Sequence, residues 1–143
     1  SVVAEASLSR SSFYSQFNDI GDVAVQLLRE LYEQNTVPSD PLAAVKFLLT
    51  EFSAHRHLYS AVLGDSATVS AEWEVCEIIA AASLPAIAAV APSHIQPEFA
   101  ARFFASGALA CIIPWLRSEQ RASVDSFAEQ LLELRPSWVQ SGS

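Results

Sequence analysis

The N-terminal segment constrains the fold more than any other part of the sequence, because it contains two short helical patterns separated by a tight turn. Val3 and Ala6 lie three residues apart on one face of the first pattern. Phe13 and Phe17 lie four apart on one face of the second. Ser9 stands at the expected N-cap of the second helix, where its hydroxyl can accept a backbone N–H. This arrangement is typical of a helix-turn-helix.

The segment resembles the DNA-binding region of the tetracycline-repressor (TetR) family of bacterial transcription regulators. That family combines an apolar residue, two alanines, a turn with serine, and an aromatic–tyrosine pair followed by phenylalanine, and residues 3–17 keep this order. The resemblance implies an all-α regulator, of the repressor type, that dimerises and leaves operator DNA when an effector binds. It places the end of a truncated helix-turn-helix head and a connector helix in residues 1–35, and the regulatory helical bundle in residues 36–143. We expect the basic start of the head to precede Ser1.

The exposed start of the second helix is the part that a recognition helix presents to DNA bases. Arg10 can make a bidentate contact with guanine or with a phosphate, while Tyr14 and Gln16 can bond phosphates. The alternative is that these are ordinary solvated helix residues. The predicted DNA-binding residues are Ser9, Arg10, Ser11, Ser12, Tyr14 and Gln16.

The acidity of the chain opposes DNA binding, because phosphate contacts need lysine and arginine. The formal net charge is −8, and Lys46 is the single lysine. Most acidic residues lie beyond the motif, so DNA binding stays the favoured interpretation. The alternative is an acidic, all-helical protein-interaction module without DNA binding. An enzyme, a metal site and a cofactor are not predicted, because the sequence shows no nucleophile–base pair, ligand cluster or phosphate loop.

The sequence favours a cytoplasmic protein with no membrane partner. Cys76 and Cys111 are too few for a disulfide framework. The most apolar stretches, residues 78–91 and 103–116, are each shorter than a span of about 20 residues and contain a proline. We therefore expect two buried helices rather than membrane anchors.

Capping signals and apolar periodicity predict a series of helices after the motif. Asp40 followed by Pro41 is a strong helix start, and the apolar stripe of that helix continues through His55 and Tyr59. Pro85 is expected to kink or shorten a later helix. The predicted helices cover residues 19–34, 40–63, 70–90, 97–117 and 123–134.

The helices that begin near residues 40, 70 and 97 are expected to enclose a mainly apolar effector cavity of roughly a few hundred Å³. His55 or Tyr59 would supply its orienting hydrogen bond. For His55 we favour the alternative of a core or rim histidine bonded to a carbonyl. The residues predicted to bind a small, largely apolar effector are Phe52, His55, Tyr59, Trp73 and Cys76.

Residues 103–115 are apolar almost all round, with small residues interspersed. Such a helix must be covered on every side, and we expect part of the cover to come from a second subunit. The alternative is a central core helix in a monomer. Pairing this helix with residues 123–134 across a two-fold axis would give the four-helix interface of the TetR family. The predicted interface residues are Phe103, Gly107, Ala108, Cys111, Trp115, Phe127 and Leu131.

Overall fold

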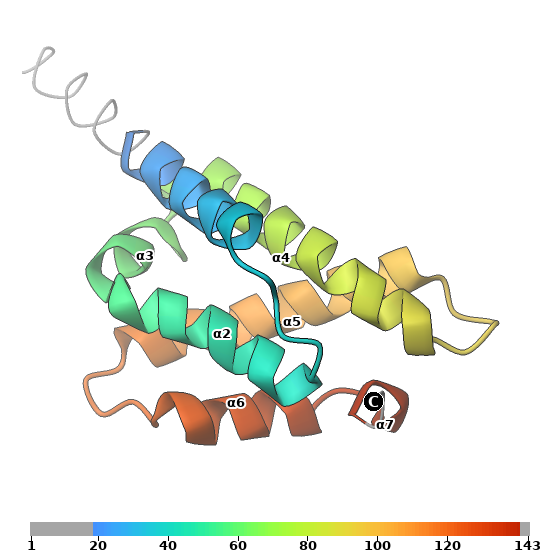
Figure 1. Ribbon diagram of the computed structural model, residues 1–143. Helices are drawn as coiled ribbons and strands as arrows, with labels where there is room; N and C mark the ends of the chain where they lie inside the picture. Colours follow the sequence, from blue (N-terminus) through green and yellow to red (C-terminus); the bar gives the residue numbers. More distant parts are fainter. Residues whose placement is uncertain (1–18, 141–143) are drawn as a thin grey trace, which may run out of the picture.

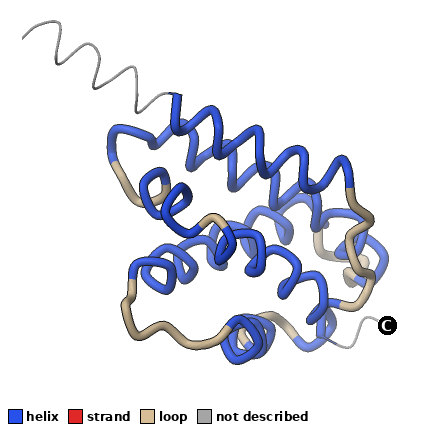
Figure 2. Tube along the Cα trace, turned by 60° about the vertical axis from the view of Figure 1, so that its left-hand side comes forward, coloured by secondary structure: helices blue, strands red, loops and turns tan. Residues whose placement is uncertain are grey.

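The computed structural model describes residues 19–140, and this part of the chain is built from α-helices and one short 3-10 turn, without strands. Figure 2 shows the helices joined by short loops. The predicted all-α fold class is therefore confirmed. The predicted DNA-binding residues lie outside the described residues.

The helix of residues 19–34 lies along α4 (Val69–Val90), and the two run in the same direction (Figure 1). Gly21 permits a close approach, since a Cβ placed on it would lie 3.0 Å from the Cβ of Ala71. Leu28 is fully buried in the hydrophobic core that the later helices share. The helix of residues 19–34, called the connector helix below, therefore shares one hydrophobic core with the later helices.

The longest pair of packed helices is α4 and α5 (Pro97–Arg117), which run antiparallel on either side of a short loop (Figure 1). An ion pair joins them, with Arg102 Nη1 2.8 Å from Glu77 Oε1. Pro85 and Pro114 lie inside these helices and end neither of them. A proline has no N–H, so the carbonyl four residues before it lacks its helical hydrogen bond. Both prolines lie on exposed parts of their helices, where such a carbonyl can bond to water. The expected shortening at Pro85 does not occur.

These two helices are longer than the apolar stretches suggested by the sequence. The segments Ser66–Val90 and Pro97–Arg117 each have a mean hydropathy of 1.6, and each is long and apolar enough to cross a membrane. The expectation that they are too short is corrected. A core helix of a soluble protein meets the same criterion, and one side of each helix lies in the core here, with Ile79 and Ile112 buried.

Helix α2 (Pro41–Ala54) begins where the sequence predicts. The Asp40 carboxylate accepts the N–H of Ala43 at 2.9 Å, and Pro41 occupies the first turn. The helix ends earlier than predicted, because the backbone of His55 (φ −119°, ψ 43°) leaves the helical region, and α3 (Arg56–Val62) follows. The predicted continuous helix is in fact two helices, and the stripe through His55 is broken.

Helix α6 (Val124–Glu133) is also capped as predicted, with the Ser123 hydroxyl accepting the N–H of Ser126 at 3.1 Å. It packs against α2, and a last short helix, α7 (Ser137–Gln140), follows (Figure 1). The C-terminal helices therefore close the side of the bundle opposite the connector helix.

Two arginines tie the ends of α3 and α5 together. Arg56 Nε donates to the carbonyl of Leu116 at 2.8 Å, and Arg117 Nη2 donates to the carbonyl of Leu63 at 2.6 Å. Each guanidinium satisfies a carbonyl near the C-terminal end of the other helix, where the helix leaves carbonyls without N–H donors. The turn after α3 continues into the 3-10 helix Ser66–Thr68.

We expect Gly64→Ala to destabilise the fold by about 1–3 kcal/mol, because Gly64 has a φ of +82° and left-handed backbone is strained for other residues. A Cβ there would also lie 2.9 Å from Ile113 Cγ2. Gly107→Ala is the matched control: Gly107 is inside α5, and apart from the backbone of that helix no atom of the protomer lies within 4 Å of the position that its Cβ would take. Measured on the monomer, that variant should gain about 0.5–1 kcal/mol. Urea unfolding measures both, and equal midpoints would contradict this account of Gly64.

Candidate ligand-binding cavity

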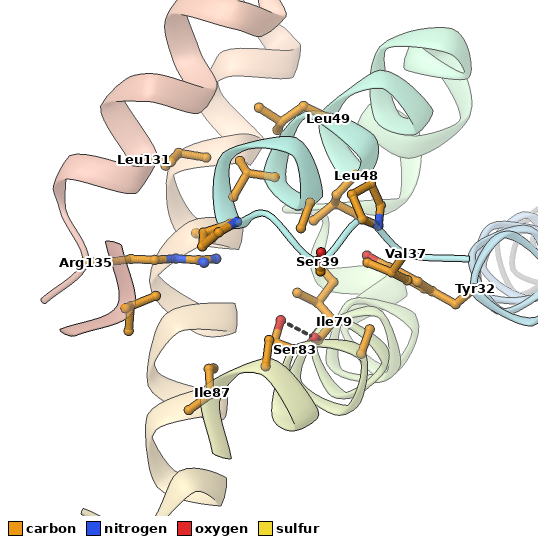
Figure 3. Close-up of a pocket in the computed structure, with 18 of the residues that line it drawn as sticks. Tyr32, Val37, Ser39, Leu48, Leu49, Ile79, Ser83, Ile87, Leu131 and Arg135 are labelled. Carbon is orange, nitrogen blue, oxygen red and sulfur yellow. Dashed lines mark hydrogen bonds between the residues drawn. The ribbon is translucent and has the colours of Figure 1, made fainter. Parts of the chain in front are cut away.

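An apolar cavity of about 100 Å³ lies between α2, α4 and α5 (Figure 3). These are the helices predicted to enclose one, and the cavity is smaller than the predicted few hundred Å³ because large aliphatic side chains fill much of the space. Its wall includes Val45, Leu48 and Leu49 from α2, Ile79, Ser83 and Ile87 from α4, and Ala108 and Ile112 from α5.

The connector helix reaches this cavity at its C-terminal end. Tyr32 lines the wall together with residues 37–39, the linker that leads into α2 (Figure 3). The ring of Tyr32 packs against Phe47, with centroids 5.9 Å apart. Burial raises the pKa of Tyr32 above its usual range, and the Glu51 carboxylate adds to the rise. The Tyr32 hydroxyl is therefore a neutral hydrogen-bonding group near physiological pH.

The C-terminal segment completes the wall with Leu131 of α6, Arg135 and Val139. Arg135 follows the end of α6, and its side chain points into the cavity (Figure 3). The guanidinium carbon lies 5.6 Å from the ring centroid of Phe104, within the range of a cation–π contact. Burial lowers the pKa of Arg135 below its usual value.

None of the five predicted effector residues belongs to this wall, which corrects the predicted site. Phe52 and Tyr59 are fully buried in the core and pack edge to face, with ring centroids 4.6 Å apart. The Tyr59 hydroxyl donates to Glu51 Oε2 at 3.0 Å, so its polar group is satisfied within the protein. His55 lies beside them, with Nε2 3.8 Å from the same carboxylate oxygen and its side chain 45% exposed.

The two α4 residues of the predicted site lie elsewhere. Trp73 is 63% exposed. Cys76 is half-buried, and its Sγ lies 3.4 Å from Ser106 Oγ on α5. The structure thus brings Phe52, His55 and Tyr59 together in one packing cluster and separates them from these two residues.

The predicted interface residues fall into two groups. Phe103 is 77% exposed and Gly107 is exposed, while Ala108, Cys111 and Phe127 are half-buried. Trp115 and Leu131 are buried within the protomer, which corrects their placement. The Trp115 ring stacks on Phe127 at 4.7 Å, its indole N–H donates to the carbonyl of Ala122, and Leu131 lines the cavity.

Sequence reasoning missed Tyr32 and Arg135 as cavity residues. By helical spacing, Tyr32 is one member of the apolar side of the helix of residues 19–34. Arg135 stands next to Pro136 at a helix end, and nothing in the sequence around it marks it as a cavity residue. The signal that could have pointed to the cavity was the stripe of Val45, Leu48 and Leu49, which comes before the helix break at His55.

The described side chains around the cavity are mainly apolar and suit contacts with an apolar ligand. Within residues 19–140, no three His, Cys, Asp or Glu side chains gather closely enough to hold a metal ion. The cavity wall is aliphatic apart from a few hydroxyls and one guanidinium. No protein-family model, curated protein or solved structure matches this chain.

Proposed function

We propose that this chain is a TetR-like, DNA-binding transcription regulator of the repressor type that acts as a homodimer and responds to a small effector in the cavity. The observation that carries the proposal is the position of the helix of residues 19–34. Its N-terminal end follows directly on the helix-turn-helix pattern of residues 3–17, and Tyr32 at its C-terminal end lines the cavity. A ligand in the cavity would therefore contact the helix that leads to the DNA-binding motif.

The proposed mechanism is a shift of population between two arrangements of the dimer. A ligand can favour one arrangement only if it binds that arrangement more tightly. Contacts with Tyr32 and the linker of residues 37–39 supply such a difference if the connector helix moves relative to α2 and α4. The two recognition helices would then no longer match successive major grooves, about 34–36 Å apart.

The exposed face of α5 supports the homodimer. Phe99 and Phe103 are one helical turn apart and are 70% and 77% exposed. Gly107 and Ala110 continue the same exposed side and allow close helix approach. Scattered exposed apolar residues are ordinary, whereas an aligned aromatic and small-residue face indicates an interaction surface.

We expect the full-length protein to select a pseudo-palindromic duplex from a random DNA pool, with an affinity that falls steeply as the salt concentration rises. Arg10→Ala should weaken binding about ten- to a hundredfold if the side chain reads a base. Tyr14→Phe should weaken it less, because it removes one phosphate contact. Fluorescence anisotropy measures affinity, and circular dichroism checks that both variants fold.

One result would count against the regulator, and another would count only against the proposed DNA-reading residues. Selection of no duplex sequence would favour the acidic protein-interaction module, which the net charge of −8 supports. Selection of a duplex with unchanged affinity in both variants would remove Arg10 and Tyr14 from the reading face. Arg56→Ala is a poor control, because Arg56 holds the end of α5. Arg102→Gln is a better one, because it changes a surface ion pair between α4 and α5.

A further inference from the structure

The exposed side of α5 divides into a half of large residues and a half of small ones. Phe99 and Phe103, in the N-terminal half, are 70% and 77% exposed. Ala110 and Pro114, in the C-terminal half, are exposed as well, and Gly107 lies between the halves. Successive members of this set are three or four residues apart, so they share one side of the helix. Large residues at one end and small ones at the other make this side complementary to itself.

An antiparallel copy of the same helix would bring each large residue over a small one. With the centre of the pair beside Gly107, Phe103 lies opposite Ala110 of the partner subunit. Phe99 in the same way lies opposite Pro114 of the partner subunit. A two-fold axis repeats both contacts with the subunits exchanged. A parallel copy would instead set aromatic residues against each other and leave a gap between the small ones.

The distribution of charge favours the same side of α5 for self-association. Two copies of a chain with a formal net charge of −8 repel each other. From Phe99 to its end, α5 contains no carboxylate. Arg102, at the edge of this side, is paired with Glu77, with Nη1 2.8 Å from Oε1. The exposed residues of α6, by contrast, include Asp125 and Glu129. A second copy can therefore approach this side of α5 with little repulsion.

Trp73 of α4 stands beside the half of α5 that has small residues. The two helices run antiparallel (Figure 1), and Cys76 Sγ lies 3.4 Å from Ser106 Oγ. One turn from this contact, in the same direction along the pair, α4 has Trp73 and α5 has Ala110. Trp73 is 63% exposed, which is unusual for so large an apolar side chain. In the antiparallel pair, the ring that covers Ala110 is Phe103 of the partner subunit, and it would lie next to Trp73.

The area that a stable dimer needs also requires a contribution from outside α5. A helix is about 10 Å wide and rises about 1.5 Å per residue, so one side of a helix as long as α5 offers roughly 300 Å². A stable interface buries roughly 800 Å² on each subunit. Exposed apolar residues that flank α5 must supply the difference, and Val69 and Trp73, one turn apart on α4, are such residues.

We propose that two copies of this chain pair through α5 in an antiparallel register centred beside Gly107, with Trp73 packed against Phe103 of the partner subunit. The inference rests on the homodimer of the proposed function and specifies its contacts. Tryptophan is among the residues that contribute most to interfaces, and an aromatic pair adds attraction beyond the area that it buries. Trp73 thus acts as an anchor on each side of the two-fold axis.

Paired cysteines test the register. In a background with Cys76→Ser and Cys111→Ser, the protein with both Phe103→Cys and Ala110→Cys should form a disulfide-linked dimer on mild oxidation. Within one subunit the two positions are about 10 Å apart along the helix, whereas the Cα atoms of a disulfide lie about 4–7 Å apart. The proteins with only one of the two cysteines should form no covalent dimer, because in the antiparallel pair each position is about as far from its own copy. Oxidation is carried out above the dissociation constant of the reduced double variant.

Trp73→Ala tests the anchor. This variant should raise the dissociation constant of the dimer at least tenfold, measured by sedimentation velocity. The fold should persist, because the side chain is largely exposed in the protomer, and circular dichroism checks this. Val23→Ala is the matched control, since it truncates an exposed apolar side chain on the connector helix, and it should leave the dissociation constant unchanged.

The outcomes separate this inference from the regulator. Covalent dimers from the single-cysteine proteins, or none from the double variant of a dimeric protein, would overturn the register. An unchanged dissociation constant in Trp73→Ala would overturn the anchor, and a monomeric wild-type protein would overturn the pairing altogether. A dimer that forms the expected disulfide and selects no duplex DNA would retain this inference and remove the regulator. Selection of DNA by a dimer that lacks the disulfide would remove this register alone.

Discussion

Phe103→Glu should convert the proposed homodimer into a monomer at micromolar concentration. The Phe103 side chain is largely exposed on α5, on the side opposite the buried Ala101, Ala105 and Leu109. In a two-fold interface the same substitution occurs on both subunits. Two unpaired carboxylates would then be buried against an apolar face, at a cost of roughly 3 kcal/mol or more. The dissociation constant would rise by about two orders of magnitude.

Val23→Glu is the matched control, because it places the same charge at an exposed valine on the connector helix, far along the chain from α5. We expect that variant to remain dimeric. Sedimentation velocity of all three proteins measures the association state, and urea unfolding checks that Phe103→Glu is still folded. A monomeric wild-type protein would refute the homodimer, and a dimeric Phe103→Glu would move the interface away from this face of α5.

The course of the helices could be predicted from local signals. Asp40 with Pro41 and Ser123 each begin a helix by satisfying backbone N–H groups close in sequence, and the structure shows both caps. Their effect depends on neighbouring residues only, so the sequence contains the whole signal. The exposed Phe103 and Gly107 were also anticipated, because a helix that is apolar all round cannot be fully covered in a chain of this length.

The break between α2 and α3 could not be predicted in this way. No proline or glycine stands at His55, and the apolar spacing continues through it to Tyr59. The tertiary contacts decide instead: Arg56 bonds the carbonyls at the end of α5, and Tyr59 bonds Glu51 of the preceding helix. Because the break redirects the stripe, Phe52 and Tyr59 pack in the core, while His55 is half-exposed beside them.

The cavity wall was missed for a similar reason. Tyr32 and Arg135 are about a hundred residues apart in sequence, and they line the same cavity because α6 packs against α2. The all-round apolar character of residues 103–115 places Trp115 at a subunit interface, whereas in the structure the loop before α6 folds back and accepts the indole N–H of Trp115. Spacing within one helix identifies a face, and the elements that cover that face depend on the whole fold.

The fold should lose stability steeply above about pH 10, the ordinary pKa of tyrosine. Burial raises the pKa of Tyr59 well above its usual range, and the charge and hydrogen bond of Glu51 raise it further. The pKa of Tyr32 is also raised, mainly by burial and further by the charge of Glu51. A tyrosine with a raised folded-state pKa contributes stability that is complete below the unfolded pKa and is lost as the pH rises toward the folded one. In that pH range, each of the two tyrosines should lower the free energy of unfolding by about 1.4 kcal/mol per pH unit.

Tyr59→Phe and Tyr32→Phe should each remove about half of this alkaline slope, and the double variant should remove both contributions. At neutral pH, Tyr59→Phe should lose about 1 kcal/mol, because the Glu51 carboxylate loses a hydrogen bond in a largely buried position. Urea unfolding at a series of pH values between neutral and strongly alkaline measures the slopes, and tyrosinate absorbance follows the ionisation itself. If the wild-type protein and the double variant lost stability equally above the ordinary tyrosine pKa, the two buried hydroxyls would not be the groups that limit the fold at high pH. The hydrogen bond between Tyr59 and Glu51 would then affect the free energy of unfolding near neutral pH alone.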